Sequence, residues 1–147
     1  MAGREKSKTL ATWLALTLGC LGVHRFYLHG WRDGLAWLHP VPALLGLAGV
    51  LRMRNLGQDD HAAWLLIPLF GLMLVVGMGA AIRYGLTPDE KWALRFGQPL
   101  RASGWLAVIG VIAALLVGGA VLMGTLAFGG QKFFEYQQQL AQEAPAR

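Results

Sequence analysis

Two long apolar runs without charged residues constrain this chain more than any other feature. They cover roughly Ala62–Ile82 and Gly104–Gly130, and neither contains an Asp, Glu, Lys or Arg. An α-helix rises 1.5 Å per residue, so about 20 apolar residues cross the hydrocarbon core of a bilayer. Both runs reach that length, and they predict two membrane-spanning helices.

The composition supports a membrane location for the whole chain. Of its 147 residues, 55% are hydrophobic and 14% are charged, and the mean hydropathy is +0.45. Soluble domains carry about 25% charged residues, so the composition excludes a disordered chain, a coiled coil and an ordinary soluble globule. No segment alternates with the period of a barrel strand. We therefore predict an all-α, polytopic helical membrane protein with about four transmembrane helices.

Two shorter apolar blocks precede the long ones, at roughly Thr9–Gly22 and Gly34–Leu51. The first reaches crossing length only if its helix continues through Val23 towards Tyr27. The second contains Pro40 and Pro42, which predict a kink or a late helix start after Pro42. The alternative is that these two blocks form a short helical hairpin beside two full spans.

The expected organisation has four parts. A basic N-terminus (1–8) leads into a helix–turn–helix segment (9–52), two further spans follow (53–130), and the chain ends in a polar tail (131–147). Within the third part, Thr87-Pro88-Asp89-Glu90 has the pattern of a helix start, with Thr87 at the N-cap. Trp92 and Phe96 lie four residues apart after it, which predicts an interfacial helix near 88–96.

The distribution of Lys and Arg hardly decides the orientation of four spans. The chain has a net charge of +5, but four crossings divide its 13 basic residues seven against six between the two sides. The basic residues before the first helix favour both termini in the cytoplasm, because the leading helix usually dominates. With one apolar segment that does not cross the membrane, these charges would be divided differently between the two sides.

The first connection carries the most informative motif. Gly19 and Gly22 allow close backbone approach, and Gly30 and Gly34 permit a sharp turn. The remaining candidate interaction residues are a basic pair and three aromatic side chains suited to the headgroup region: His24, Arg25, Phe26, Tyr27 and Trp31. An ordinary inter-helix turn with interfacial anchors explains the same residues, and the two interpretations stay open at this point.

The stretch resembles the two-transmembrane ("TM-two") domain family over about Lys6–Leu51. The shared pattern is a basic lead-in, a helix ending in glycines, the run Gly22-Val23-His24-Arg25-Phe26-Tyr27, a glycine turn and a second helix. The resemblance implies a multispanning membrane protein without an established reaction, acting as an interaction, regulatory or membrane-organising module. Residues 84–92 also resemble an extension in bacterial members, which implies a bacterial inner membrane.

Small residues recur every four positions on the last span, at Gly110, Ala114 and Gly118. This spacing lets helices approach closely, either between two copies of the chain or against its own spans. The spacings of the four histidines match no metal signature, and the single cysteine excludes a multi-thiolate site. We therefore expect no catalytic residues, no metal and no cofactor.

The charges avoid the two long spans, whereas transport mechanisms usually need charges within the membrane. We therefore expect a non-enzymatic interaction or membrane-organising module that acts through the His24–Tyr27 turn. The alternative is a small transporter or a channel-like oligomer. The expected partners are the lipid bilayer and either a second copy or another membrane protein, with no nucleic acid.

Overall fold

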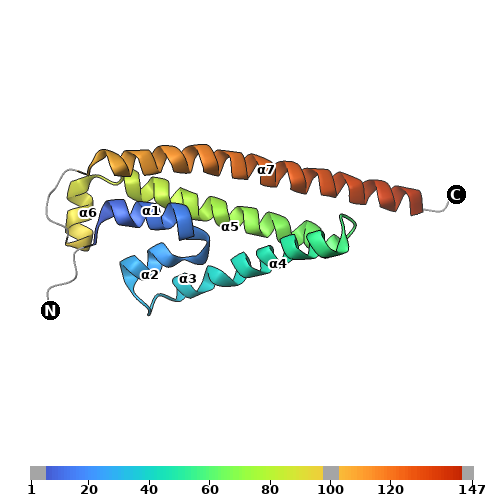
Figure 1. Ribbon diagram of the computed structural model, residues 1–147, viewed down its shortest axis with the longest axis horizontal. Helices are drawn as coiled ribbons and strands as arrows, with labels where there is room; N and C mark the ends of the chain where they lie inside the picture. Colours follow the sequence, from blue (N-terminus) through green and yellow to red (C-terminus); the bar gives the residue numbers. More distant parts are fainter. Residues whose placement is uncertain (1–5, 98–102, 144–147) are drawn as a thin grey trace.

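The computed structural model describes residues 6–97 and 103–143, and this part of the chain is all-helical. Arg4, Arg101 and Arg147, which entered the charge count, lie outside it. The helices are α1 (Lys8–Leu18), the 3-10 turn η1 (Gly19–Leu21), α2 (Val23–His29), α3 (Gly34–Leu38), α4 (Pro40–Leu56), α5 (His61–Leu86), α6 (Asp89–Phe96) and α7 (Trp105–Glu143). They form an elongated bundle in which α1 begins near one end and α7 ends at the other (Figure 1).

Three segments are long and apolar enough to cross a membrane, namely Gly34–Leu56, His61–Leu86 and Trp105–Glu143. The predicted class, a polytopic helical membrane protein, is confirmed. The first apolar block forms only the shorter segment Lys8–Leu21, so the structure has three candidate crossings where about four were expected. The result lies between four full spans and a short hairpin beside two spans. The first block is too short to cross, whereas α3 and α4 together are long enough.

The first helix does not continue towards Tyr27, so the first apolar block stays below crossing length. Helix α1 ends at Leu18, and Gly22 follows η1 with a φ of +73°. This left-handed backbone conformation is rare for residues other than glycine. A Cβ at Gly22 would also lie 2.7 Å from the carbonyl oxygen of Ala36. The chain therefore reverses here, and α2 runs back beside α1 towards the same end of the bundle (Figure 1).

The two prolines act at the start of α4. Asp33 caps α3 by accepting a hydrogen bond from the backbone N–H of Leu35, and α3 ends at Leu38. Helix α4 then begins at Pro40 rather than after Pro42, because a proline in the first turn has no intrahelical donor to lose. The predicted interruption is therefore present, and its place is His39.

Helix α5 is the centre of the bundle and contacts α1, η1, α4 and α7. Glycines make these contacts close. A Cβ added at Gly46 of α4 would lie 2.5 Å from the Cβ of Phe70, and one at Gly19 would lie 2.5 Å from the Cα of Gly77. Because lipid tails are as apolar as the helices, close packing of small residues is the main force that holds such a bundle together.

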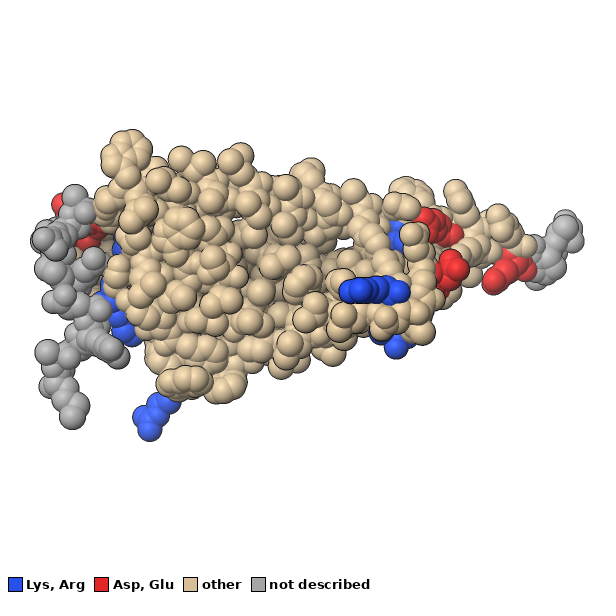
Figure 2. Space-filling view, viewed as in Figure 1, with Lys and Arg blue, Asp and Glu red and all other residues tan. Residues whose placement is uncertain are grey.

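The surface of the bundle suits a bilayer. Large apolar side chains are exposed along α4, α5 and α7, among them Leu44, Leu65, Leu72, Ile112 and Leu116. In the space-filling view the middle of the visible face carries uncharged residues, and charged residues gather towards the two ends (Figure 2). The molecule thus exposes apolar side chains along its middle and charged residues towards its two ends.

Candidate functional site

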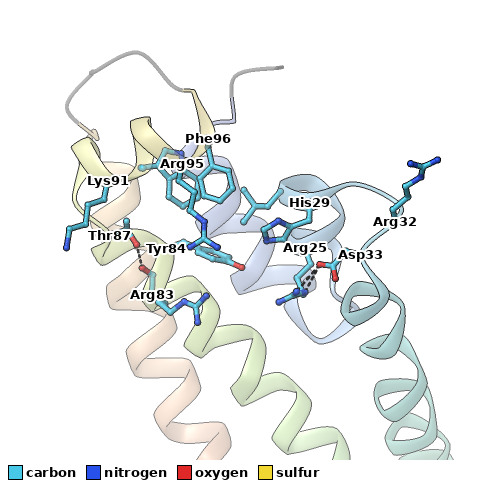
Figure 3. A pocket seen from close by; sticks show the side chains of 12 residues that line it. Arg25, His29, Arg32, Asp33, Arg83, Tyr84, Thr87, Lys91, Arg95 and Phe96 are labelled. Carbon is cyan, nitrogen blue, oxygen red and sulfur yellow. Dashed lines mark hydrogen bonds and ion pairs between the residues drawn. The ribbon is translucent and has the colours of Figure 1, made fainter. Parts of the chain in front are cut away.

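A pocket of about 480 Å³ opens at the end of the bundle where α2, the last turn of α5 and α6 meet (Figure 3). Helix α6 lies across this end (Figure 1). We call the cavity the basic pocket, and its lining residues are Arg25, Leu28, His29, Arg32, Asp33, Arg83, Tyr84, Thr87, Lys91, Trp92, Arg95 and Phe96. Five of these carry positive charge and one is acidic.

The one carboxylate of the lining is already engaged. Asp33 Oδ2 accepts a hydrogen bond from Arg25 Nε at 2.9 Å and forms an ion pair with Arg25 Nη2, also at 2.9 Å. Its Oδ1 accepts the cap bond from the Leu35 N–H at 3.0 Å. Desolvation acts to raise the pKa of Asp33, but the Leu35 N–H and the Arg25 guanidinium outweigh it and hold the pKa below its usual value. Asp33 therefore remains ionised and neutralises Arg25.

The other four cations of the basic pocket form no ion pair with any carboxylate in the described ranges: Arg32, Arg83, Lys91 and Arg95. All four side chains are exposed. Figure 3 shows the side chains of Arg25, Arg83 and Arg95 extending from three different helices towards the space between them, whereas Arg32 and Lys91 extend away at its margins. The pocket thus holds a surplus of positive charge that its own acid does not balance.

Aromatic rings form the wall of the basic pocket nearest α6. The ring centroids of Trp92 and Phe96 are 4.5 Å apart, and those of Tyr84 and Trp92 are 5.9 Å apart. The guanidinium of Arg95 lies 5.5 Å from the centroid of Phe96. His29 contributes little charge, because desolvation and the nearby Arg25 lower its pKa. An apolar wall beside free cations is suited to a ligand that carries both an anionic group and an apolar part.

A polar junction fixes α6 at this end. Lys8 Nζ donates to Asp89 Oδ1 and to the carbonyl oxygen of Thr87, at 2.8 and 2.7 Å, and Ser103 donates to Asp89 through both its backbone N–H and its hydroxyl. Hydrogen bonds from Lys8 and then Ser103 lower the pKa of Asp89 to about 2. This junction positions Lys91 and Arg95 relative to α1.

The predicted helix near 88–96 is present, but the details of its start and orientation differ. Thr87 is the C-cap of α5, where its hydroxyl donates to the carbonyl oxygen of Arg83, and Pro88 takes the N-cap position. Trp92 is only 2% exposed, and its Nε1 donates to the carbonyl oxygen of Lys6 at 2.8 Å. The ring of Trp92 therefore packs into the bundle instead of into lipid.

The residues of the first connection line the pocket, form an aromatic cluster or attach α2 to α1. Arg25 enters the pocket. Phe26 is half-buried and forms an aromatic cluster with the exposed Trp31 and Trp37, with centroid separations of 5.1 to 5.9 Å. The hydroxyl of Tyr27 instead accepts a hydrogen bond from the backbone N–H of Ser7 and ties α2 to the start of α1. The expected contact surface is therefore not a single continuous patch.

His24 is 2% exposed and lies outside the lining of the basic pocket. Its ring lies 5.8 Å from that of His39 and 5.7 Å from that of Tyr84, and its Nδ1 has no hydrogen-bond partner among the residues described. Burial, followed by the neighbouring His39 and Arg25, lowers the pKa of His24 to about 4. His24 is therefore a neutral packing residue behind the turn at physiological pH.

The glycines of the motif have separate structural tasks. Gly19 is in backbone contact with Gly77, and Gly22 makes the reversal described above. Gly30 ends α2 with φ +81°, and Gly34 begins α3 with open space around its Cα. These positions set the direction of α2 and so aim Arg25 at the pocket.

The small-residue stripe of α7 faces the rest of the chain. A Cβ at Gly110 would meet the Thr12 side chain at 3.0 Å, one at Gly118 would meet the Met78 Cβ at 3.1 Å, and Ala114 is fully buried. The structure therefore uses this stripe for internal packing. Sequence reasoning missed the equivalent glycines of α4 and α5, although the spacing of Gly46 and Gly49 was a usable signal.

Sequence reasoning also missed the partners of Arg25 in the pocket. Arg83, Lys91 and Arg95 were counted among the 13 basic residues of the chain, without a link to Arg25. Their excess in one short connection was the available signal, but nothing in the sequence says that this connection meets the first one. Tyr84 was not singled out at all.

The fold and the pocket together define a polytopic helical membrane protein with a basic cavity at one end. Residues 4–53 match the family described as TM2 domain, which covers about a third of the chain. The chain therefore carries a TM2 domain at residues 4–53, where its resemblance to that family was predicted. Neither a curated protein nor a solved structure matches it significantly.

Proposed function

We propose that this integral membrane protein is a non-enzymatic interaction or membrane-organising module whose basic pocket binds an anionic group at the membrane surface. The observation that carries the proposal is the convergence of Arg25 from the TM2 turn with Arg83 and Arg95 in one cavity. Guanidinium groups bind phosphate and carboxylate through paired hydrogen bonds, and partial removal from water strengthens these bonds.

The charge asymmetry between the two ends supports a cytoplasmic location for the pocket. Among the described residues, the pocket end holds seven Lys and Arg, namely Lys6, Lys8, Arg25, Arg32, Arg83, Lys91 and Arg95. The opposite end holds three, namely Arg52, Arg54 and Lys132. Three crossings make the rule on cytoplasmic Lys and Arg informative where four left it undecided. We place the protein in a bacterial inner membrane, on the resemblance of residues 84–92 to bacterial members.

The test is photo-crosslinking in cells from an unnatural amino acid at position 32, an exposed position at the margin of the basic pocket. The matched control carries the same group at position 58, an exposed position at the opposite end. We expect position 32 to capture molecules with anionic groups and position 58 not to. Equal capture at both positions would overturn the proposal.

A flux measurement separates this proposal from the transporter alternative. Reconstituted protein should leave ion flux across proteoliposomes at the background level, and Arg95→Gln should change capture at position 32 without changing flux. Gradient-dependent flux that Arg95→Gln abolishes would favour a transporter instead.

A further inference from the structure

We infer that the anionic group in the basic pocket is a terminal phosphate, either a phosphomonoester or a diphosphate. The inference rests on the proposed function and specifies its ligand. Its first support is the charge balance, since the lining has five cations and one carboxylate, and that carboxylate is committed to Arg25. A terminal phosphate carries about −1.5 to −2 at neutral pH, whereas a phosphodiester or a carboxylate carries only one negative charge. The dianion therefore offsets more of the surplus.

The second support is the type and arrangement of the cations. Arg83 projects from α5 and Arg95 from α6, while Arg25 approaches from α2 (Figure 3). Planar guanidinium groups approaching from several sides can each donate to a different oxygen of one phosphate. A terminal phosphate presents three free oxygens, and a diester presents two. The three-sided arrangement therefore matches the terminal group better.

The third support concerns what carries the phosphate. Arg83 lies in the last turn of the candidate span α5, at the level where a lipid headgroup begins. The wall of Tyr84, Trp92 and Phe96 lies next to the cations, and a volume of about 480 Å³ lies within the range of about 300–1,000 Å³ that is typical of ligand pockets. A single inorganic phosphate would leave most of this space unused. A lipid phosphate would fill it with its glycerol or prenyl portion.

The experiment titrates the purified full-length protein, in uncharged detergent, with four probes. Phosphatidate presents a terminal lipid phosphate, phosphatidylglycerol presents a lipid phosphodiester, and inorganic phosphate and pyrophosphate present the group without a lipid. Native mass spectrometry follows the lipids, and calorimetry follows the soluble anions. We expect phosphatidate to bind about tenfold or more tightly than phosphatidylglycerol.

The variants locate the binding. Arg83→Gln and Arg95→Gln should each weaken phosphatidate binding about tenfold, the loss of one charge-assisted contact. Arg83→Lys keeps the charge but loses the planar fork, and it should fall between Arg83→Gln and the unmodified protein. Arg54→Gln removes one charge at the opposite end and should bind phosphatidate normally. Because Arg83 and Arg95 are exposed, each variant should keep the melting temperature of the unmodified protein, which confirms that it is folded.

The outcomes distinguish the inference of a terminal phosphate from the proposed binding of an anionic group in general. Tight phosphatidate binding that depends on Arg83 and Arg95 supports a lipid source, and equally tight binding of phosphate or pyrophosphate with the same dependence supports a soluble source. Equal binding of phosphatidate and phosphatidylglycerol overturns the terminal phosphate but leaves anion binding in place. If no anionic probe responds to these arginine substitutions, both the terminal phosphate and the proposed function fail.

Discussion

The two ends of the bundle use similar residues in opposite ways. At the end that carries the α4–α5 connection, Arg52 pairs with Asp60 at 2.8 Å, and Lys132 pairs with Glu135 at 2.5 Å and lies 4.8 Å from the ring of Trp64. At the pocket end, Lys8 and Arg25 have carboxylate partners, but four cations of the lining have none among the described residues. The first end pairs two of its three described cations, all except Arg54, whereas the pocket lining at the second end pairs one of five.

The difference in pairing indicates what the charges at each end do. Counted over the described residues, three Asp and Glu accompany seven Lys and Arg at the pocket end, and four accompany three at the other, giving net charges of +4 and −1. A cation that is already paired orients local structure and adds less to the binding of a further anion than an unpaired cation does. Unpaired cations repel one another, so an anionic ligand relieves that repulsion and is bound more tightly.

The opposite end also has a cavity, of about 560 Å³, lined by His61, Trp64, Leu65, Gly129, Lys132, Phe133 and Tyr136. Its only ammonium group belongs to Lys132, which is 6% exposed and already paired. The two cavities are similar in size but differ in free charge. Size alone therefore does not distinguish a binding site here, whereas the availability of cations does.

The largest expected effect concerns the separation of the two ends by the membrane. In a Cys20→Ser background, single cysteines replace Arg32 at the pocket end and Gln58 at the other, both exposed positions. Three crossings place the two cysteines on opposite sides of the membrane, with position 32 on the proposed cytoplasmic side. A membrane-impermeant maleimide should therefore label only Gln58→Cys in intact cells and both cysteines after permeabilisation. Labelling of both cysteines in intact cells would contradict the assignment of the two ends to different sides.

The next largest effect concerns the contact that holds the turn on α5. Gly77→Ala places a Cβ 2.8 Å from the Cα of Gly19, with backbone on both sides, and should lower the free energy of unfolding by about 3 kcal/mol, at the upper end of overpacking costs. Gly79→Ala is the matched control, because its Cβ meets open space on the same helix. Thermal unfolding in detergent measures both, and equal melting temperatures would disprove the close contact.

A smaller effect concerns the junction at α6. Asp89→Asn removes the carboxylate that pairs with Lys8, a residue that is 6% exposed, and should cost about 1.5–3 kcal/mol, the range for hydrogen bonds to charged groups. Because the pKa of Asp89 is lowered to about 2, its contribution is complete above the unfolded pKa near 4 and is lost as the pH falls through about 2. Melting curves between pH 6 and pH 2 should show the gap between the unmodified protein and Asp89→Asn closing as the pH falls. A gap that is constant with pH would rule out the ion pair.

The smallest effect belongs to the exposed pair at the opposite end. Hydrogen bonds from Arg52 lower the pKa of Asp60, but the Arg52 side chain is 47% exposed, and solvent screens such pairs strongly. Arg52→Gln should therefore change the melting temperature far less than Asp89→Asn does. A loss as large as that of Asp89→Asn would show that both ends depend equally on their ion pairs.

The sequence alone was sufficient for the class of the protein and for its most diagnostic motif. The runs Ala62–Ile82 and Gly104–Gly130 predicted spans because length and hydropathy are local properties, and α5 and α7 confirm them. The run Gly22-x-His24-Arg25-Phe26-Tyr27 identified the TM2 domain within the matched residues 4–53. The helix at Asp89–Phe96 was also predicted from its local pattern.

The extent of the first helix could not be predicted from composition. Apolar residues continue beyond Gly19, so hydropathy permits a longer helix up to Tyr27. The chain turns instead because Gly19 packs on Gly77 and Gly22 fits against Ala36, and both partners lie far along the sequence. The same contacts explain why the first block stays short and the described residues contain three candidate crossings.

The basic pocket was beyond sequence reasoning for the same reason. Each cation was visible in the sequence, but Arg25 and Arg83 lie on helices whose meeting depends on the reversal at Gly22 and on the position of α5. The sequence by itself therefore determined that the chain belongs in a membrane and where its charges lie along the chain. Which charges share one cavity follows from the packing of the helices, because the interaction of charges depends on their distance in space and not on their position in the sequence.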